Sequence, residues 1–207
     1  KPLKPSTLTM QGISRRTMEE HYKLYEGYCN KANEIRQKLQ SVNLSTANQT
    51  YSEIRELKVE LSFALGGAIN HEIYFANLGG GGGPASGRVA ELINRDFGSF
   101  DSWAADLRAT GLAARGWAWL ALDLATGHLF NFIGDAQNTY PIWNCSPILA
   151  LDTYEHAYYL DYAVNRGAYI DVYFQNIDWE DVNRRLATAE KMYHAASGGQ
   201  AATYQAV

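Results

Sequence analysis

The chain has 207 residues, 46% of them apolar and 19% charged, which is the balance of a globular protein with a sizeable core. Its 18 Lys and Arg against 22 Asp and Glu give a formal net charge of −4, which argues against a nucleic-acid-binding protein. Two cysteines exclude a disulfide-rich miniprotein, and no apolar run approaches the roughly 20 residues of a membrane span. We therefore expect a soluble protein whose partners are neither nucleic acid nor membrane.

The first half of the chain has the pattern of two long helices. Residues 1–16 show no apolar period and are predicted to form an extended arm. From Thr17 to about Leu39, apolar and aromatic residues recur at helical spacing, and the same period returns from Ile54 to near Leu78. A short polar break over 46–52 separates the two stretches, so the sequence predicts an antiparallel helical hairpin.

Five consecutive glycines, 79–83, followed by Pro84 mark the clearest boundary in the chain. Neither a helix nor a strand tolerates this composition, because glycine is too mobile and proline lacks an N–H. We therefore expect two domains, an arm with a helical hairpin over 1–83 and a second domain over 84–207. The last ten residues, rich in Ser, Gly, Gln and Ala, are expected to form a loose tail.

The second half mixes helical and strand patterns. Its predicted elements, in chain order, are helices over 86–94 and 99–111, strands over 117–122, 129–133 and 148–151, and helices over 154–163 and 179–194. The predicted fold class is α+β, in which the helical hairpin precedes an α/β domain with a small three-stranded antiparallel sheet.

Histidines are the first candidates for chemistry, and the chain has five. His128 lies beside a turn glycine and His194 near the tail, so both are expected at the surface. His21, His71 and His156 fall in aromatic surroundings, where a buried imidazole without a partner would be costly.

Asp152 precedes His156 by four residues. A strand that ends at Leu151 and a helix that begins near Thr153 would let both side chains point toward one spot. The alternative from spacing alone is an Asp that caps the helix beside a hydrogen-bonded core histidine. Three imidazoles and one carboxylate would suit Mn, Fe or Zn rather than Ca, and spacing does not choose among them.

The segment Asp-Thr-Tyr-Glu-His-Ala-Tyr-Tyr over 152–159 resembles the D-x-W-E-H-A-Y-Y signature of the iron/manganese superoxide dismutases. The resemblance runs in order from about Thr17 to Ala189. The other segments that carry it are Asn-His with a Tyr at 70–74, the glycine-rich 79–87, Ile-Asn-Arg-Asp-Phe-Gly-Ser-Phe at 93–100, Gly-Trp-Ala-Trp-Leu at 116–120, Asn-Arg at 165–166 and Asn-Ile-Asp-Trp at 176–179.

This resemblance implies a metal-dependent enzyme that converts superoxide to dioxygen and hydrogen peroxide. It implies one ion per chain with a bound water or hydroxide, and the ligands it carries over are His21, His71, Asp152 and His156. It also implies a homodimer, with a higher oligomer left open, in which Glu155 reaches His156 of the partner subunit. Such a contact would fix the orientation of a ligand. Trp117 and Tyr158 would lie around the metal ligands or at the dimer interface.

The resemblance also bears on the choice of metal. In this family a glutamine holds the bound water, and the iron and manganese types supply it from different segments. Gly66 and Gly67 stand where the iron type has its glutamine, whereas Gln137 stands where the manganese type has it. We therefore expect manganese, with iron as the alternative.

The helix around His21 departs from the family pattern, which has a second His four residues on and a Tyr eight residues on. Here these positions hold Tyr25 and Cys29, and Tyr28 comes one residue early. At about 100° per residue, Tyr28 lies near −20° from His21 and Cys29 near +80°. Either a local distortion brings Tyr28 inward, or a regular helix places Tyr25 and Cys29 at the substrate funnel.

Two functional hypotheses follow. The first is a superoxide dismutase in which Gln137 and the residues Tyr25 and Tyr28 act near the bound solvent and Arg166 attracts the anion. The second is a metal-binding dimer of the same fold with weak or no dismutase activity. The compartment is not indicated, because Lys1 is not a start methionine and a removed signal peptide would leave no trace.

Overall fold

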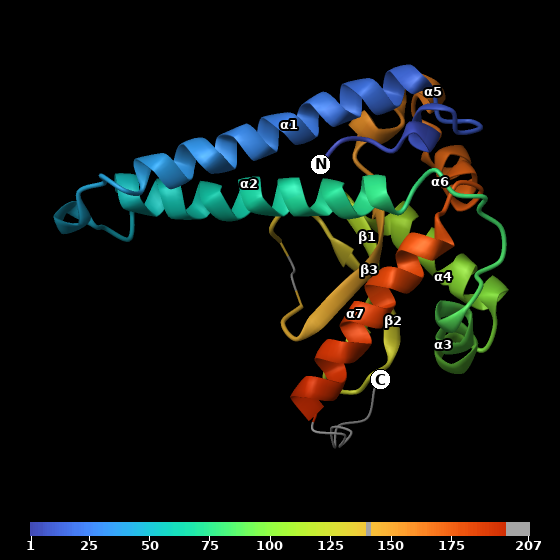
Figure 1. Ribbon diagram of the computed structural model, residues 1–207. Coiled ribbons are helices and arrows are strands. Elements are labelled where there is room, and N and C mark those ends of the chain that lie inside the picture. The colour runs from blue at the N-terminus through green and yellow to red at the C-terminus, as the bar shows by residue number, and fades with distance from the viewer. Residues whose placement is uncertain (140–141, 198–207) are drawn as a thin grey trace.

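The computed structural model describes residues 1–139 and 142–197. The predicted hairpin is confirmed: α1 spans Arg15–Lys38 and α2 spans Glu53–Ala76. The two helices run side by side along one edge of the molecule, and a short 3-10 turn, Leu44–Thr46, lies in their connection (Figure 1). Each helix begins at a serine whose hydroxyl accepts a backbone N–H three residues on, Ser14 from Thr17 and Ser52 from Arg55.

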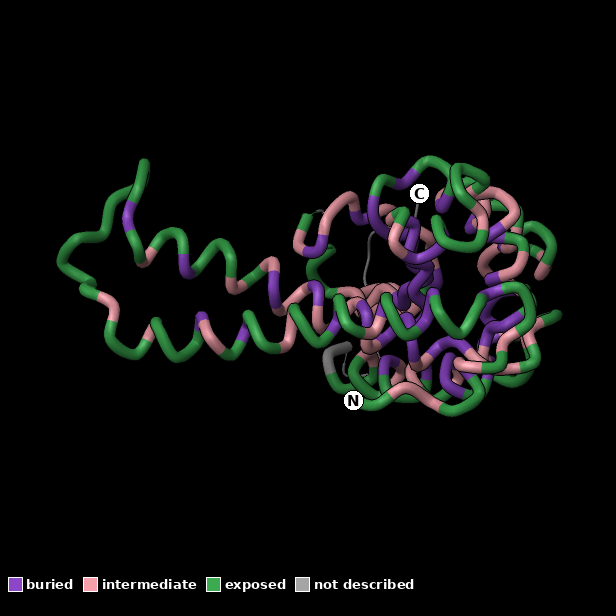
Figure 2. The backbone as a smooth tube through the Cα atoms, turned by 90° about the horizontal axis from the view of Figure 1, so that it is seen from above, coloured by how far each residue is buried: buried purple, intermediate pink, exposed green. Residues whose placement is uncertain are grey.

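The far end of the hairpin projects from the rest of the molecule, and most of its residues are exposed (Figure 2). The two helices are held together there by a small core of their own, made of Ala32, Ile35, Leu57 and Ala64. The near ends of the helices pack against the second half of the chain, where the main core lies. The hairpin residues closest to the sheet are therefore the ones that can contribute to a buried site.

The predicted three-stranded antiparallel sheet is also confirmed, in the order β2-β1-β3. Its strands are β1 Trp117–Asp123, β2 Leu129–Gly134 and β3 Cys145–Asp152. The central strand is almost entirely buried, whereas β3 is an edge strand whose last five residues are buried. Burial of an edge strand requires other groups to pair with its outer N–H and C=O groups.

Helices surround this sheet. They are α3 Arg88–Phe97, α4 Phe100–Ala113, α5 Tyr159–Tyr162, α6 Arg166–Phe174 and α7 Trp179–Ser197. Helix α7 crosses the sheet and contacts β1 and β3, whereas α4 contacts β1 and β2 (Figure 1). Helix α2 of the hairpin also contacts β3, which brings the two halves of the chain together.

Three sequence predictions in this region and in the arm were wrong or incomplete. The predicted helix over 154–163 is broken into a 3-10 turn, Glu155–Ala157, and the four-residue α5. Helix α6 was not predicted. The arm is not fully extended, because Pro5–Leu8 form a 3-10 turn. Proline favours the first turn of such an element, since its missing N–H would be unpaired there anyway. The expected loose tail lies outside the described residues.

The glycine run connects α2 to the segment before α3. Gly79 and Gly82 have φ of +82° and +57°, and a Cβ on Gly82 would collide with the backbone of Gln175. Glycine is therefore required at Gly82 for both its conformation and its close packing. The domain boundary at residue 83 stays a prediction.

Among the described helices, none has the combination of length and hydropathy that would let it cross a membrane.

Candidate metal centre

Four side chains from four elements meet at the junction of the hairpin and the sheet. His21 comes from α1, His71 from α2, Asp152 from the last residue of β3, and His156 from the 3-10 turn that follows. One ligand atom from each lies within 4.8 Å of the corresponding atom of every other. The structure therefore brings together the four residues that the resemblance implies as ligands.

The Asp152 carboxylate lies at the centre of this cluster. Its Oδ2 is 3.1 Å from Nε2 of His21 and 3.1 Å from Nε2 of His156, while Nε2 of His71 is 3.6 Å away. Its Oδ1 accepts the backbone N–H of Tyr154 at 2.9 Å. Asp152 thus also closes the turn after the strand. It does not cap the following element as the alternative from spacing expected, because the residue before the 3-10 turn is Tyr154 and no side chain caps that turn.

The His71 ring is oriented by its own helix. Its Nδ1 lies 2.6 Å from the carbonyl oxygen of Gly67, one turn earlier, so Nδ1 carries the proton that it donates there. The lone pair of Nε2 is then directed toward the cluster, and this buried nitrogen has no hydrogen-bond partner among the described residues. A nitrogen lone pair and a carboxylate that face each other in a buried site repel unless a cation lies between them.

The protonation states fit the same interpretation. Burial lowers the pKa of His71 to about 3 and also lowers the pKa of His21, so both imidazoles stay neutral near pH 7. Burial opposes ionisation of Asp152, but the neighbouring His156 and His21 more than offset it and hold the carboxyl pKa below its usual range. Burial also opposes protonation of His156, yet Asp152 raises the net pKa of that imidazole. The two neutral imidazoles of His21 and His71 beside an ionised carboxylate are donors of the kind that a metal site uses.

Aromatic rings enclose the cluster. Phe75 and Tyr74 lie 5.0 Å from the His21 ring, Trp117 lies 5.2 Å from His71, and Tyr154 stacks on His156 at 5.2 Å, measured between ring centroids. These side chains limit access of water and lower the local dielectric constant, which strengthens the interaction of the ligands with a cation.

Gln137 lies at the edge of the cluster in the segment after β2, and its residue is 4% exposed. Its Oε1 accepts from Trp117 Nε1 at 3.2 Å and from Asn70 Nδ2 at 3.3 Å, and its Nε2 donates to the Tyr28 hydroxyl at 3.4 Å. The amide is therefore held by α1, α2 and β1 together.

Gly66 and Gly67 make this arrangement sterically possible. A Cβ on Gly66 would collide with the backbone carbonyl of Gln137, and one on Gly67 would lie 2.5 Å from the Tyr28 ring. Gly66 thus leaves space for the segment that carries Gln137, and Gly67 leaves space for the Tyr28 ring.

Tyr28 faces the cluster, and α1 is regular through this region. The Tyr28 ring lies 5.4 Å from that of His71, and burial raises its hydroxyl pKa. The expectation that a regular helix would keep Tyr28 out was wrong, because seven residues turn a helix back by only about 20°. Tyr25 is also buried, but its hydroxyl donates to Glu72, and Cys29 lies beside Tyr25.

The other predicted residues lie around this centre in different environments. Tyr158 is buried and stacks on Tyr169, and its hydroxyl accepts from Arg166 Nε at 3.2 Å. Arg166 Nη1 also donates to the Ala114 carbonyl at 2.6 Å, so this guanidinium binds the carboxyl end of α4.

Glu155 is exposed next to the partly exposed His156. The surface positions expected for His128 and His194 are confirmed.

Two residues that support the centre were missed. Asn70 donates to both oxygens of Gln137, and Tyr169 donates to the Asp152 carbonyl at 2.8 Å. Asn70 adjoins His71 in the quoted motif, so the sequence offered a signal for it. Tyr169 offered none, because the helix that carries it was not predicted.

Comparison with known proteins agrees with this geometry. The profile for the iron/manganese superoxide dismutases, alpha-hairpin domain, matches residues 9–79, and the profile for the C-terminal domain of the same family matches residues 85–185. The chain belongs to the iron/manganese superoxide dismutase family.

Individual relatives cover most of the chain. The proteins named superoxide dismutase [Fe] of Aquifex aeolicus (strain VF5) and Aquifex pyrophilus are each 45% identical over 198 residues, which span 93% of this chain and 92% of the relative. The superoxide dismutase [Mn] 1 of Halobacterium salinarum is 37% identical over 128 residues, which span 61% of this chain and 64% of the relative. The relatives of this superoxide dismutase family member thus carry names with either metal.

The glycines of α2 give a test of how this family member packs Tyr28. In metal-free protein, Gly67→Ala should lower the free energy of unfolding by about 1–3 kcal/mol, because the new methyl group collides with the Tyr28 ring. Gly27→Ala is the matched control: it is exposed on α1 with no atom near its Cβ position, and it should gain about 0.5–1 kcal/mol. Urea denaturation measures both. Equal stability of Gly67→Ala and wild type would contradict the placement of Tyr28 against α2.

Proposed function

We propose that this chain is a superoxide dismutase whose metal ion is held by His21, His71, Asp152 and His156. The observation that carries the proposal is the buried cluster itself, in which three imidazoles converge on one carboxylate oxygen and His71 directs an unpaired nitrogen toward it. A mixed nitrogen and oxygen donor set of this kind suits manganese or iron.

The ion, one per chain, would supply one-electron chemistry that converts two superoxide anions and two protons to one dioxygen and one hydrogen peroxide. The origin of Gln137 in the segment after β2 supports manganese, whereas the names of the two Aquifex relatives support iron. Metal analysis of protein expressed with both metals present distinguishes the two.

The residues around the cluster have separate tasks. The aromatic enclosure formed by Phe75, Trp117 and Tyr154 shields the ligands from water, and the His21, His71 and Asp152 side chains are fully buried. Gln137 and Tyr28 form a polar pair at the edge of the site, where their amide and hydroxyl can hold solvent and move a proton. In the same proposal, Arg166 attracts the superoxide anion and Tyr25 contributes at the substrate funnel.

We propose that the active assembly is a homodimer. Glu155 is exposed, the His156 side chain is 30% exposed, and the neighbouring Tyr159 and Leu160 are each 50% exposed. A second copy that covered this surface would bury the apolar side chains and could place a carboxylate on His156.

The ligand assignment predicts a large loss of metal on substitution. Wild type should retain about one Mn or Fe per chain after dialysis, whereas His71→Ala and Asp152→Ala should bind the ion at least about 100-fold more weakly, because each loses a donor from a buried site. His128→Ala is the control. It removes an exposed imidazole just before β2, outside the cluster, and should retain the metal. Inductively coupled plasma mass spectrometry measures the content. Undiminished binding in both ligand variants would refute the site.

The polar pair predicts a kinetic effect without metal loss. Tyr28→Phe should slow the removal of superoxide about tenfold and change its pH dependence, because the variant loses the hydroxyl that contacts Gln137. Tyr51→Phe, at an exposed tyrosine of the hairpin tip, is the matched control and should behave as wild type. Pulse radiolysis gives the rates. If Mn- or Fe-loaded wild type leaves superoxide decay at its uncatalysed rate, the chain is a metal-binding protein and not a dismutase.

The dimer proposal predicts that Glu155→Ala weakens self-association at least tenfold and lowers metal retention, since both depend on one carboxylate across the interface. The control is Glu180→Ala, which changes an exposed glutamate of α7. Analytical ultracentrifugation over a concentration series measures the association. A wild-type chain that sediments as a monomer at micromolar concentration contradicts the proposal.

A further inference from the structure

The metal centre is divided between two parts of the chain that the backbone joins only loosely. His21 and His71 belong to the hairpin, whereas Asp152 and His156 follow the sheet. The segment that leaves α2 is the glycine run 79–83, and glycine is the residue that least restricts backbone conformation. The covalent connection therefore cannot set the distance between His71 and Asp152, and noncovalent contacts must do so.

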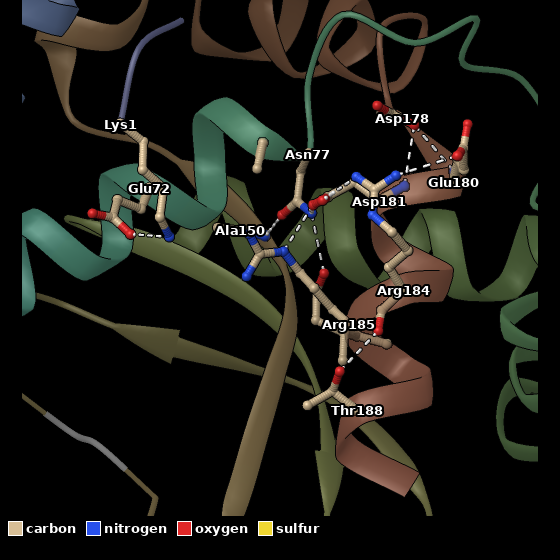
Figure 3. Close-up of polar contacts among 12 residues, drawn as sticks. Lys1, Glu72, Asn77, Ala150, Asp178, Glu180, Asp181, Arg184, Arg185 and Thr188 are labelled. Atoms are coloured by element: carbon tan, nitrogen blue, oxygen red, sulfur yellow. Dashed lines mark hydrogen bonds and ion pairs between the residues drawn. The ribbon is translucent and has the colours of Figure 1, made fainter. Parts of the chain in front are cut away.

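Asn77 is the residue at which α2 meets the edge of the sheet. It is fully buried at the carboxyl end of the helix, six residues after His71 (Figure 3). Its Oδ1 accepts the N–H of Ala150 at 3.0 Å, and its Nδ2 donates to the carbonyl of Ile148 at 3.2 Å. Residues two apart on one strand present their polar groups to the same edge, so the side chain pairs with β3 as a neighbouring strand would.

Two further hydrogen bonds connect Asn77 to the start of α7 and to the residue just before it. Its Nδ2 also donates to Asp181 Oδ2 at 2.9 Å, and its backbone carbonyl accepts the N–H of Asp178 at 2.7 Å. Asp181 is itself held by Arg184 and Arg185 at 2.7 and 2.8 Å (Figure 3). The amide therefore has fixed partners on two elements, and a small rotation of α2 would break several hydrogen bonds at once.

The path from this contact to the metal ligands is short on both sides. Along α2, six residues correspond to about 9 Å of helix. Along β3, Ala150 precedes Asp152 by two residues, or about 7 Å of strand. Two tyrosine hydroxyls complete the same edge, Tyr173 on the Ala150 carbonyl and Tyr169 on the Asp152 carbonyl, so the outer edge of β3 is paired up to the ligand itself.

We propose that Asn77 is a positioning residue of the metal centre, whose hydrogen bonds to the edge of β3 fix His71 relative to Asp152. The proposal rests on the proposed metal site. It assigns to Asn77 no contact with substrate or ion, and its effect passes through the geometry of the two ligands.

The test compares two asparagines with the same number of hydrogen bonds. Asn183 on α7 accepts from Val89 N and donates to the carbonyls of Ser86 and Trp179, at 2.8–2.9 Å, but it joins α7 to the start of α3 and not to the hairpin. Asn77→Asp and Asn183→Asp each keep the size of the side chain and remove both N–H donors. Both variants should unfold at a lower temperature than wild type.

Only the Asn77 variant should change the metal site. Titration with Mn²⁺ against a chelator is expected to show at least tenfold weaker binding for Asn77→Asp, with an altered electron paramagnetic resonance spectrum of the bound ion. Asn183→Asp should bind Mn²⁺ as wild type does, with the wild-type spectrum. If Asn77→Asp does not fold, Asp181→Ala removes one of the partners of Asn77 and should change affinity and spectrum in the same direction by less.

The outcomes separate this inference from the function on which it rests. Folded Asn77→Asp or Asp181→Ala protein with wild-type affinity and spectrum would overturn the positioning role while leaving the metal site intact. Equal changes in the Asn183 variant would also overturn it, because the effect would then follow stability alone. A wild-type chain that binds no Mn²⁺ or iron would refute the proposed function, and the inference with it.

Discussion

The structure depends on one buried carboxylate. Asp152 has no exposed surface, yet the protein keeps it ionised by surrounding it with imidazoles and by a backbone N–H. An ionised group in this position would be strongly destabilising without compensating charge. The burial of three histidines around it, with His71 fixed so that a lone pair faces the carboxylate, is therefore an arrangement that a cation completes.

Convergence on this carboxylate requires the two halves of the chain to meet accurately. The far end of the hairpin has a small core of its own and projects into solvent, so packing of that end contributes little to the placement of the hairpin against the sheet. Its near end packs into the main core and is also fixed by polar contacts, through Asn77 on β3 and through Lys4, which bonds both the Ala76 carbonyl and Asp178. The Asn77 contacts also pair backbone groups of the buried edge strand β3 that would otherwise be unsatisfied.

The position of the polar pair, Gln137 and Tyr28, depends on the space available beside α2. Gln137 approaches α2 because Gly66 has no side chain there, and the Tyr28 ring lies beside His71 because Gly67 has none. The glycine pair on α2 and the polar side chains that pack against it therefore depend on each other sterically. Exchange of either part alone would produce a collision or a cavity.

The sequence alone determined the hairpin and the strands, because apolar periodicity reports nearest neighbours along the chain. The four clustered residues followed from the resemblance of their motifs to a known family, since spacing by itself could not show that residues so far apart meet. It did not determine which face of α1 Tyr28 occupies, since an irregularity was expected where a regular helix suffices. It gave no sign of helix α6 or of Tyr169 on the Asp152 carbonyl. The pairing of Asn77 with β3 joins residues more than 70 positions apart, and only the tertiary structure decides such contacts, because they form when separately specified elements pack together.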